Sequence, residues 1–214
     1  MEAREMLSRL EQQGIIPIVT LEDAQDAEWV CKILHSAGMQ IVEITFRTQA
    51  AAQSIEIVKA HLPELIVGAG TVLTQDQASK AYQAGASFLV SPGLDLNIVR
   101  WAQERDLLVI PGVITPTEIL SALHQNITLM KFFPAESYGG IKALSALRGP
   151  FPQVKFLPTG GINPQNAADY LALSNVIAVG GTWMVTPELI RKREQEVISK
   201  LACEAIRIAN QRGS

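Results

Sequence analysis

Short apolar runs alternate with amphipathic stretches along most of the chain. The apolar runs begin roughly 20 to 25 residues apart, and the stretches between them carry apolar residues at helical spacing. Several of these stretches open with Thr, Asp or Asn, which favour helix N-caps, and some close on Gly. This alternation predicts repeated strand–helix units around a parallel sheet. The predicted strands are residues 15–20, 40–46, 65–70, 87–92, 107–112, 129–135, 154–161 and 175–181.

The number and regular length of these units favour a closed barrel over an open sheet. An open doubly wound sheet needs more varied connections to reverse its strand order, and it commonly carries a phosphate motif after its first strand. Here the first predicted strand ends in VTLEDA, without such a motif. We therefore expect an α/β fold of the (β/α)8 TIM-barrel type, as a single domain over residues 1–214. A helix is expected at its start, in MEAREMLSRLEQQG.

Composition and charge argue against several classes of partner. The chain has 214 residues, 48% of them hydrophobic, which is enough for a large core. Its formal charge is -3, without a basic run, so no nucleic-acid partner is expected. The start lacks the apolar core of a signal peptide, and no later apolar stretch approaches the ~20 residues of a membrane span. We expect a cytoplasmic protein that binds no membrane.

The histidines give no sign of metal chemistry. His35, His61 and His124 lie far apart in segments that are predicted to be helical. They show none of the paired spacing that zinc and iron sites use. The sequence therefore predicts neither a metal site nor a bound cofactor.

Two predicted strands carry charged residues on the face that points into the barrel. In QIVEITFR (40–47) the period of two puts Glu43 and Arg47 opposite the apolar residues between them. In LMKFFP (129–134) the same period separates Lys131 from its apolar neighbours on either side. Because the apolar faces should pack against the helices, all three charged side chains are expected to point inward.

Lys131 and Glu43 have two interpretations. The first is a buried structural ion pair. The second is a Schiff-base site, because apolar surroundings and a nearby cation lower the pKa of an amine and make it a nucleophile toward a carbonyl. In that site Glu43 would move protons, and the two-pronged guanidinium of Arg47 would bind a substrate carboxylate.

Paired glycines end the last two predicted strands. PTGGI (158–162) and VGGTW (179–183) stand where barrels often bind phosphate with main-chain N–H groups. Thr182 would add a hydroxyl donor, although it also suits an ordinary strand end, and each glycine pair also suits a simple tight turn. VGAGT (67–71) lacks the third glycine of a dinucleotide loop, so we expect it to bring Thr71 close to a ligand.

Taken together, these motifs resemble those of the 2-keto-3-deoxy-6-phosphogluconate (KDPG) aldolases. The resemblance implies that Lys131 forms the Schiff base and that Glu43 is the general acid/base. It also implies that Arg47 and Thr71 hold the carboxylate of pyruvate. The resemblance runs from about Ile15 to Trp183. The matching segments, in chain order, are EITFRT, VGAGTVLT, SPGL, PGV, KFFPAE, GGIKAL, PTGGI and GGTW.

The resemblance further implies a substrate pocket, a phosphate site and a homotrimer of barrels. The sequence departs from the family at Thr182, where most members have serine. Threonine keeps the hydroxyl, but its additional methyl group is expected to crowd the phosphate site. The residues implied to line the pocket are Pro92, Phe133 and Thr159, and those implied to bind phosphate are Gly160, Gly161, Gly181 and Thr182.

The implied reaction is the reversible cleavage of KDPG, a small-molecule substrate, into pyruvate and glyceraldehyde 3-phosphate. Three alternatives stay open. A 4-hydroxy-2-oxoglutarate (KHG) aldolase would share the pyruvate half of the site but would bind a carboxylate where the phosphate would sit. A barrel that isomerises or decarboxylates a sugar phosphate would use Lys131 and Glu43 as acid and base. A phosphosugar-binding barrel would catalyse nothing.

Overall fold

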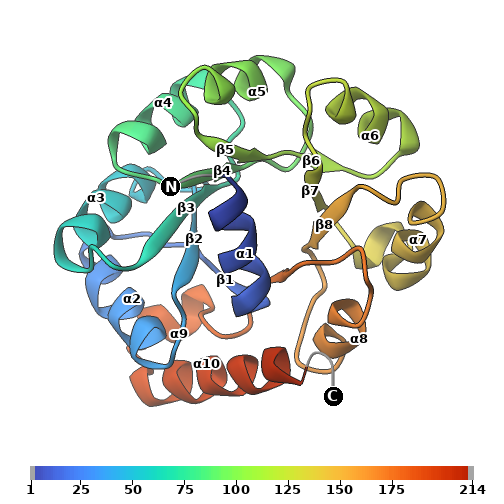
Figure 1. Ribbon diagram of the computed structural model, residues 1–214. Helices are drawn as coiled ribbons and strands as arrows, with labels where there is room; N and C mark the ends of the chain where they lie inside the picture. Colours follow the sequence, from blue (N-terminus) through green and yellow to red (C-terminus); the bar gives the residue numbers. More distant parts are fainter. Residues whose placement is uncertain (1–2, 212–214) are drawn as a thin grey trace.

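The computed structural model describes residues 3–211, whose strands form a central barrel inside a ring of helices (Figure 1). The domain expected over residues 1–214 thus includes residues 1–2 and 212–214, which lie outside the described part. The strands are β1 (Ile15–Val19), β2 (Ile41–Thr45), β3 (Ile66–Gly70), β4 (Phe88–Val90), β5 (Leu108–Ile110), β6 (Gly112–Val113), β7 (Leu129–Phe132), β8 (Lys155–Pro158) and β9 (Val179–Gly181).

Each strand is followed by helical structure, except that β5 runs directly into β6. None of the helices in the described part of the chain is long and apolar enough to cross a membrane. The α-helices are α1 (Ala3–Gln13), α2 (Ala27–Ser36), α3 (Ala51–His61), α4 (Gln75–Gln83), α5 (Leu96–Gln103), α6 (Pro116–Leu123), α7 (Gly140–Leu147), α8 (Ala167–Leu171), α9 (Pro187–Arg191) and α10 (Gln195–Asn210), and the 3-10 helices are η1 (Ala24–Asp26) and η2 (Glu136–Tyr138).

All paired strands are parallel, and together they close the barrel. One sheet has the order β5-β4-β3-β2-β1-β9, and a second has the order β6-β7-β8. A bridge between Thr159 and Gly180 joins β8 to β9. The remaining join is the run from β5 into β6, which lie where one strand, 107–112, was predicted, with β6 ending one residue beyond it at Val113. The predicted (β/α)8 barrel is confirmed.

The predicted strand is split into β5 and β6 at Pro111, because proline lacks an N–H group. The N–H of Lys131 donates to the carbonyl of Pro111 at 2.8 Å, within the ladder between β6 and β7. Proline has no N–H with which to make the next bond of the ladder. β5 and β7 are therefore not hydrogen-bonded as strands in the described structure.

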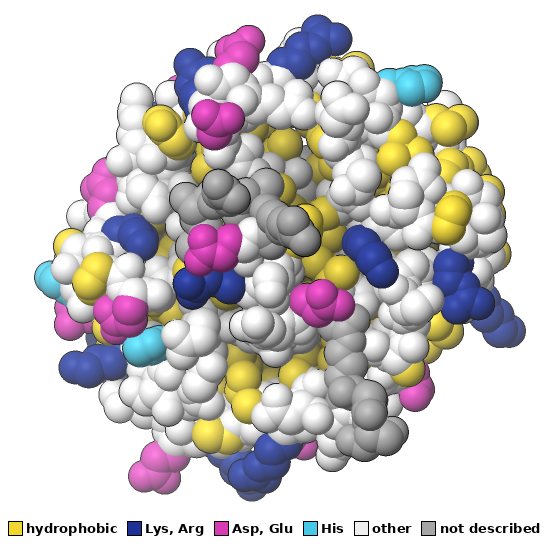
Figure 2. Space-filling model, in the orientation of Figure 1, with side chains coloured by type: hydrophobic (Ala, Val, Ile, Leu, Met, Phe, Trp, Pro, Cys, Tyr) yellow, Lys and Arg dark blue, Asp and Glu magenta, His cyan; other side chains and the backbone are white. Residues whose placement is uncertain are grey.

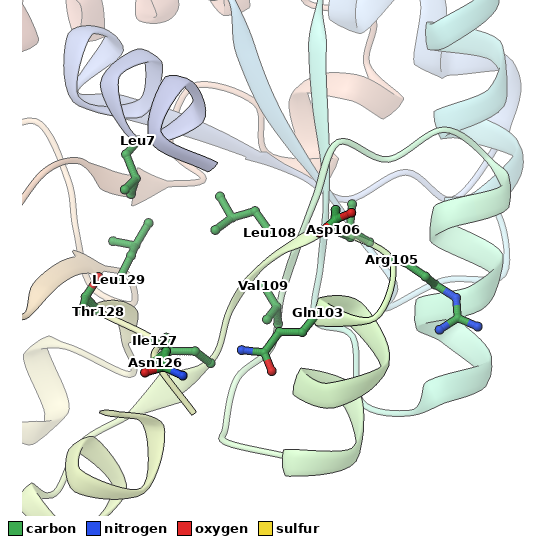
Figure 3. A pocket seen from close by; sticks show the side chains of 11 residues that line it. Leu7, Gln103, Arg105, Asp106, Leu108, Val109, Asn126, Ile127, Thr128 and Leu129 are labelled. Atoms are coloured by element: carbon green, nitrogen blue, oxygen red, sulfur yellow. The ribbon is translucent and has the colours of Figure 1, made fainter. Parts of the chain in front are cut away.

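A hollow of about 800 Å³ opens beside this unpaired seam, at the amino-terminal end of the barrel (Figure 3). Leu7 of α1 borders it together with Leu108 and Leu129, the first residues of β5 and β7. None of the site residues predicted from the sequence lines this hollow. Its size alone therefore does not make it the active site.

The strands bury their two faces in separate layers. Ile41 and Leu129 belong to a cluster inside the barrel, whereas Val42, Ile44 and Met130 belong to the layer between strands and helices. This confirms the predicted period of two in β2 and β7.

Helix α1 covers the amino-terminal end of the barrel (Figure 1). Its Met6 and Leu10 are fully buried in the inner cluster. The amide of Gln13 donates to the carbonyl of Ile41 at 2.7 Å and accepts from the N–H of Gln40 at 2.6 Å. On the same face, acidic and basic side chains are interspersed (Figure 2). The opposite end, where the strands finish, is left for the predicted site.

Candidate active site

The carboxyl ends of the strands enclose a cavity of about 190 Å³. It gathers every residue predicted for the site except Thr71 and Pro92. Its lining consists of Ile18, Glu43, Arg47, Lys131, Phe133, Thr159, Gly160, Gly161, Ile162, Gly180, Gly181 and Thr182.

Lys131 lies in the middle of the barrel wall, because β7 pairs with β6 on one side and with β8 on the other. Its side chain is only 4% exposed, and its Nζ lies 4.9 Å from the centroid of the Phe133 ring. Burial lowers the pKa of this amine, the cation of Arg47 lowers it further, and Glu43 opposes the shift. Neutral amine is therefore available at lower pH than for an exposed lysine.

Glu43 is 1% exposed and faces the same cavity from β2. Its Oε1 atom has no hydrogen-bond partner in the described structure. Burial raises the pKa of this carboxyl group, while Lys131 and Arg47 act in the opposite direction. No ion pair joins Glu43 to Lys131 among the residues described, so the geometry does not support the structural ion-pair interpretation.

Gly70 at the end of β3 makes room for this carboxylate. A Cβ atom at Gly70 would lie 1.9 Å from Oε1 of Glu43, which no real structure tolerates. This role was not predicted from the sequence, where the segment was expected only to bring Thr71 close to a ligand. The available signal was a glycine inside an apolar strand, which often marks a close approach by another group.

Thr71 and Pro92 follow β3 and β4 but do not line the cavity. Thr71 has a φ of 57°, a conformation that costs about 1–3 kcal/mol in a residue other than glycine. Such strain is concentrated at functional sites, which is compatible with a ligand contact. The roles of both residues stay predictions.

Arg47 lies in the turn beyond β2 and is exposed, rather than inside the barrel as the strand pattern predicted. The strand ends at Thr45, so the alternation of faces no longer holds at this position. Arg47 still borders the cavity. Its guanidinium makes no hydrogen bond or ion pair within the described part of the chain, so its donors are available to a ligand.

The glycine pairs after β8 and at β9 form the other wall of the cavity. Among the described residues, the main-chain N–H groups of Gly161, Ile162, Thr182 and Trp183 donate no hydrogen bond. A Cβ atom at Gly161 would lie 2.4 Å from the side chain of Glu136. Gly161 therefore has no room for a side chain. The unbonded main-chain N–H groups lie where the phosphate site was predicted.

Thr159 and Ile18 complete the interior of the cavity. Thr159 is 1% exposed, and its buried hydroxyl oxygen has no hydrogen-bond partner in the residues described. A substrate oxygen is a suitable partner for such a group. Ile18 supplies apolar lining that was not predicted, because an inward isoleucine in a buried strand carries no distinguishing signal in the sequence.

Most of the chain matches the model of one known family, described as KDPG and KHG aldolase, over residues 6–201. The chain belongs to this family. The 2-dehydro-3-deoxy-phosphogluconate aldolase of Haemophilus influenzae is 40% identical over 205 residues, which are 96% of this chain and 97% of that protein. Because the KDPG and KHG family consists of aldolases, the isomerase, decarboxylase and non-catalytic alternatives lose support.

Two solved structures of KDPG aldolases have the same fold. The one from Legionella pneumophila, with pyruvate captured as a covalent carbinolamine intermediate, has a TM-score of 0.90 and 36% identity, covering 93% of this chain and 97% of that chain. The one from Zymomonas mobilis, with 3-phosphoglycerate, has a TM-score of 0.89 and 36% identity, covering 94% and 95%. The predicted resemblance and the predicted fold are both confirmed.

Proposed function

We propose that the protein is a class I aldolase that cleaves KDPG into pyruvate and glyceraldehyde 3-phosphate. The observation that carries this proposal is a desolvated lysine amine, Lys131, which shares a cavity with the unpaired carboxylate of Glu43. Family membership supports the reaction class. The covalent carbinolamine in the Legionella pneumophila relative supports a lysine nucleophile, because an amine that adds to a ketone forms such a species.

The residues suggest the following reaction. The neutral amine of Lys131 adds to the carbon 2 ketone, and water leaves to give an iminium ion. The iminium draws the electrons of the bond between carbons 3 and 4 while Glu43 accepts the proton of the carbon 4 hydroxyl, directly or through water. Glyceraldehyde 3-phosphate departs. The remaining enamine is protonated at carbon 3, and water hydrolyses the iminium to free pyruvate and Lys131.

The direct test is to assay the purified protein with KDPG and with KHG. We expect pyruvate to be released from KDPG with a higher kcat/KM than from KHG. KHG cleavage is the second candidate, because the matching family includes KHG aldolases. A protein that cleaves neither compound would contradict both assignments.

Arg47→Lys should raise the KM for pyruvate more than it lowers kcat. An ammonium cannot reproduce the two parallel hydrogen bonds of a guanidinium with a carboxylate. The KM can be measured in the condensation direction. Arg100→Lys is a matched control, because Arg100 is an exposed residue of α5 outside the cavity. A normal KM in Arg47→Lys would exclude the proposed carboxylate contact.

The N–H groups after β8 and β9 are proposed to bind the substrate phosphate. The 3-phosphoglycerate in the Zymomonas mobilis relative supports a phosphate subsite in this family. Each charge-assisted hydrogen bond contributes roughly 1.5 to 3 kcal/mol, so two that are partly offset by desolvation predict a preference of about a hundredfold. Glyceraldehyde 3-phosphate should therefore exceed glyceraldehyde in kcat/KM by about that factor.

Thr182 variants examine the same site. Thr182→Ser keeps a hydroxyl donor and should retain the preference, whereas Thr182→Val removes the donor and should reduce it. Exchange of the methyl protons of pyruvate should continue in both, because it involves only the Lys131 side of the cavity. Equal kcat/KM for the two aldehydes in the unmodified protein would refute the phosphate site and favour KHG as the substrate.

The homotrimer, the cytoplasmic location and the absence of a metal or cofactor all stay predictions.

A further inference from the structure

Glu136 is the last residue of the KFFPAE motif and has no part in the reaction described above. It is the first residue of η2, which packs against the loop that follows β8. Its main-chain N–H donates to the carbonyl of Gly160 at 3.1 Å. Its side chain covers Gly161, since a Cβ atom there would come within 2.4 Å of Cγ of Glu136. Glu136 thus contacts the proposed phosphate loop through both its main chain and its side chain.

Tyr170 of α8 holds this carboxylate in place. Its side chain is fully buried, and its hydroxyl donates a hydrogen bond to Oε1 of Glu136. Burial and the neighbouring carboxylate raise the pKa of the Tyr170 hydroxyl, so it stays protonated as a donor. Gly140 leaves space for the pair, because a Cβ atom there would lie 2.8 Å from the hydroxyl. The contact therefore joins two elements that are distant in sequence.

Two asparagines hold the next carbonyl of the loop. Nδ2 of Asn163 donates to the oxygen of Gly161 at 3.2 Å, and Nδ2 of Asn166 donates to the same oxygen at 3.1 Å. The carbonyls of Gly160 and Gly161 are thus both bound by protein donors. In a trans peptide the C=O and the following N–H point in opposite directions. These bonds consequently direct the N–H groups of Gly161 and Ile162 away from Glu136 and the asparagines.

We propose that Glu136 and Tyr170 are positioning residues that aim the N–H groups of Gly161 and Ile162 at the substrate phosphate. This proposal rests on the phosphate site proposed above. The two side chains would not touch the phosphate themselves. They would determine how strongly the enzyme prefers a phosphorylated aldehyde, by keeping the two donors turned into the cavity before substrate binds.

Tyr170→Phe is the central test, because it removes the hydroxyl and keeps the buried ring. We expect kcat/KM for glyceraldehyde 3-phosphate to fall about tenfold, the size of one lost hydrogen bond, and chiefly through KM. The kcat/KM for glyceraldehyde and the exchange of pyruvate methyl protons should stay within about twofold. A general loss of structure would lower all three together.

Tyr138→Phe is the matched control. Tyr138 lies in η2 next to the same loop, and its side chain is 54% exposed. Its hydroxyl makes no hydrogen bond in the described structure. Removing that hydroxyl should leave the preference for glyceraldehyde 3-phosphate unchanged.

Substitutions of Glu136 test whether its hydrogen bond with Tyr170 or its negative charge is responsible for the preference. Glu136→Gln keeps an oxygen that can accept from Tyr170, so it should retain most of the preference. Glu136→Ala should lose it at least as far as Tyr170→Phe does. Because the two residues act through one contact, the double variant Glu136→Ala/Tyr170→Phe should be no worse than Glu136→Ala alone.

The outcomes distinguish this inference from the phosphate site itself. An unmodified protein without preference for the phosphorylated aldehyde would refute the phosphate site, and the inference with it. A clear preference that survives Tyr170→Phe would overturn only the positioning role. A loss in Glu136→Gln as large as in Glu136→Ala would also overturn it, because charge rather than the hydrogen-bonded position would then be responsible.

Discussion

Lys131→Ala is expected to lose turnover of KDPG by several orders of magnitude. Without the amine no iminium forms, so the bond between carbons 3 and 4 has no electron sink to stabilise the departing electrons. Lys155→Ala is the matched control in the neighbouring strand. Lys155 is exposed at the opposite end of β8, where its Nζ donates to the carbonyl of Ser174 at 2.7 Å. That variant should keep nearly full turnover.

Borohydride reduction in the presence of pyruvate identifies the reacting lysine directly. Reduction converts the imine into a stable secondary amine, so the protein gains mass and the modified peptide can be sequenced. We expect the modification on the peptide that contains Lys131, and none in Lys131→Ala. A modification on Lys155, or on any lysine in a helix, would exclude Lys131 as the nucleophile.

The pH dependence of trapping tests the environment of the amine. Only the neutral amine adds to pyruvate, so the trapping rate should rise with pH as Lys131 loses its proton. Since burial lowers the pKa of Lys131, the midpoint of this rise should lie below the ordinary lysine value of 10.5. A midpoint at or above 10.5 would show that the amine is not desolvated as the structure indicates.

Glu43→Gln should separate Schiff-base formation from proton transfer. The amide keeps the shape of the side chain but cannot accept a proton near neutral pH. Pyruvate should still be trapped by borohydride, although more slowly. Exchange of the pyruvate methyl protons in deuterated water should fall by about 10²- to 10⁴-fold, the usual contribution of a general base.

The control for this variant is Glu56→Gln. Glu56 is an exposed residue of α3, away from the cavity, and makes no hydrogen bond or ion pair in the described structure. It should exchange pyruvate protons at the normal rate. Normal exchange in Glu43→Gln would remove Glu43 from proton transfer, and a loss of trapping equal to the loss of exchange would mean that it acts earlier, in forming the iminium.

The sequence by itself determined the barrel and the orientation of its two central charged side chains. Side chains alternate along a strand with a period of two, and this local rule holds in both β2 and β7. It therefore placed Glu43 and Lys131 inside the barrel, where the structure buries both. Arg47 shows the limit of the rule, because the strand ends at Thr45 and the turn that follows has no such period.

Only the tertiary structure decided which groups contact one another inside the site. Whether Glu43 pairs with Lys131 depends on the distance between two strands, and the strand pattern contains no distances. The close approach of Gly70 to Glu43 joins neighbouring strands. The bond between Tyr170 and Glu136 joins residues 34 positions apart. Such contacts arise when the barrel closes, because closure brings together side chains that no local pattern relates.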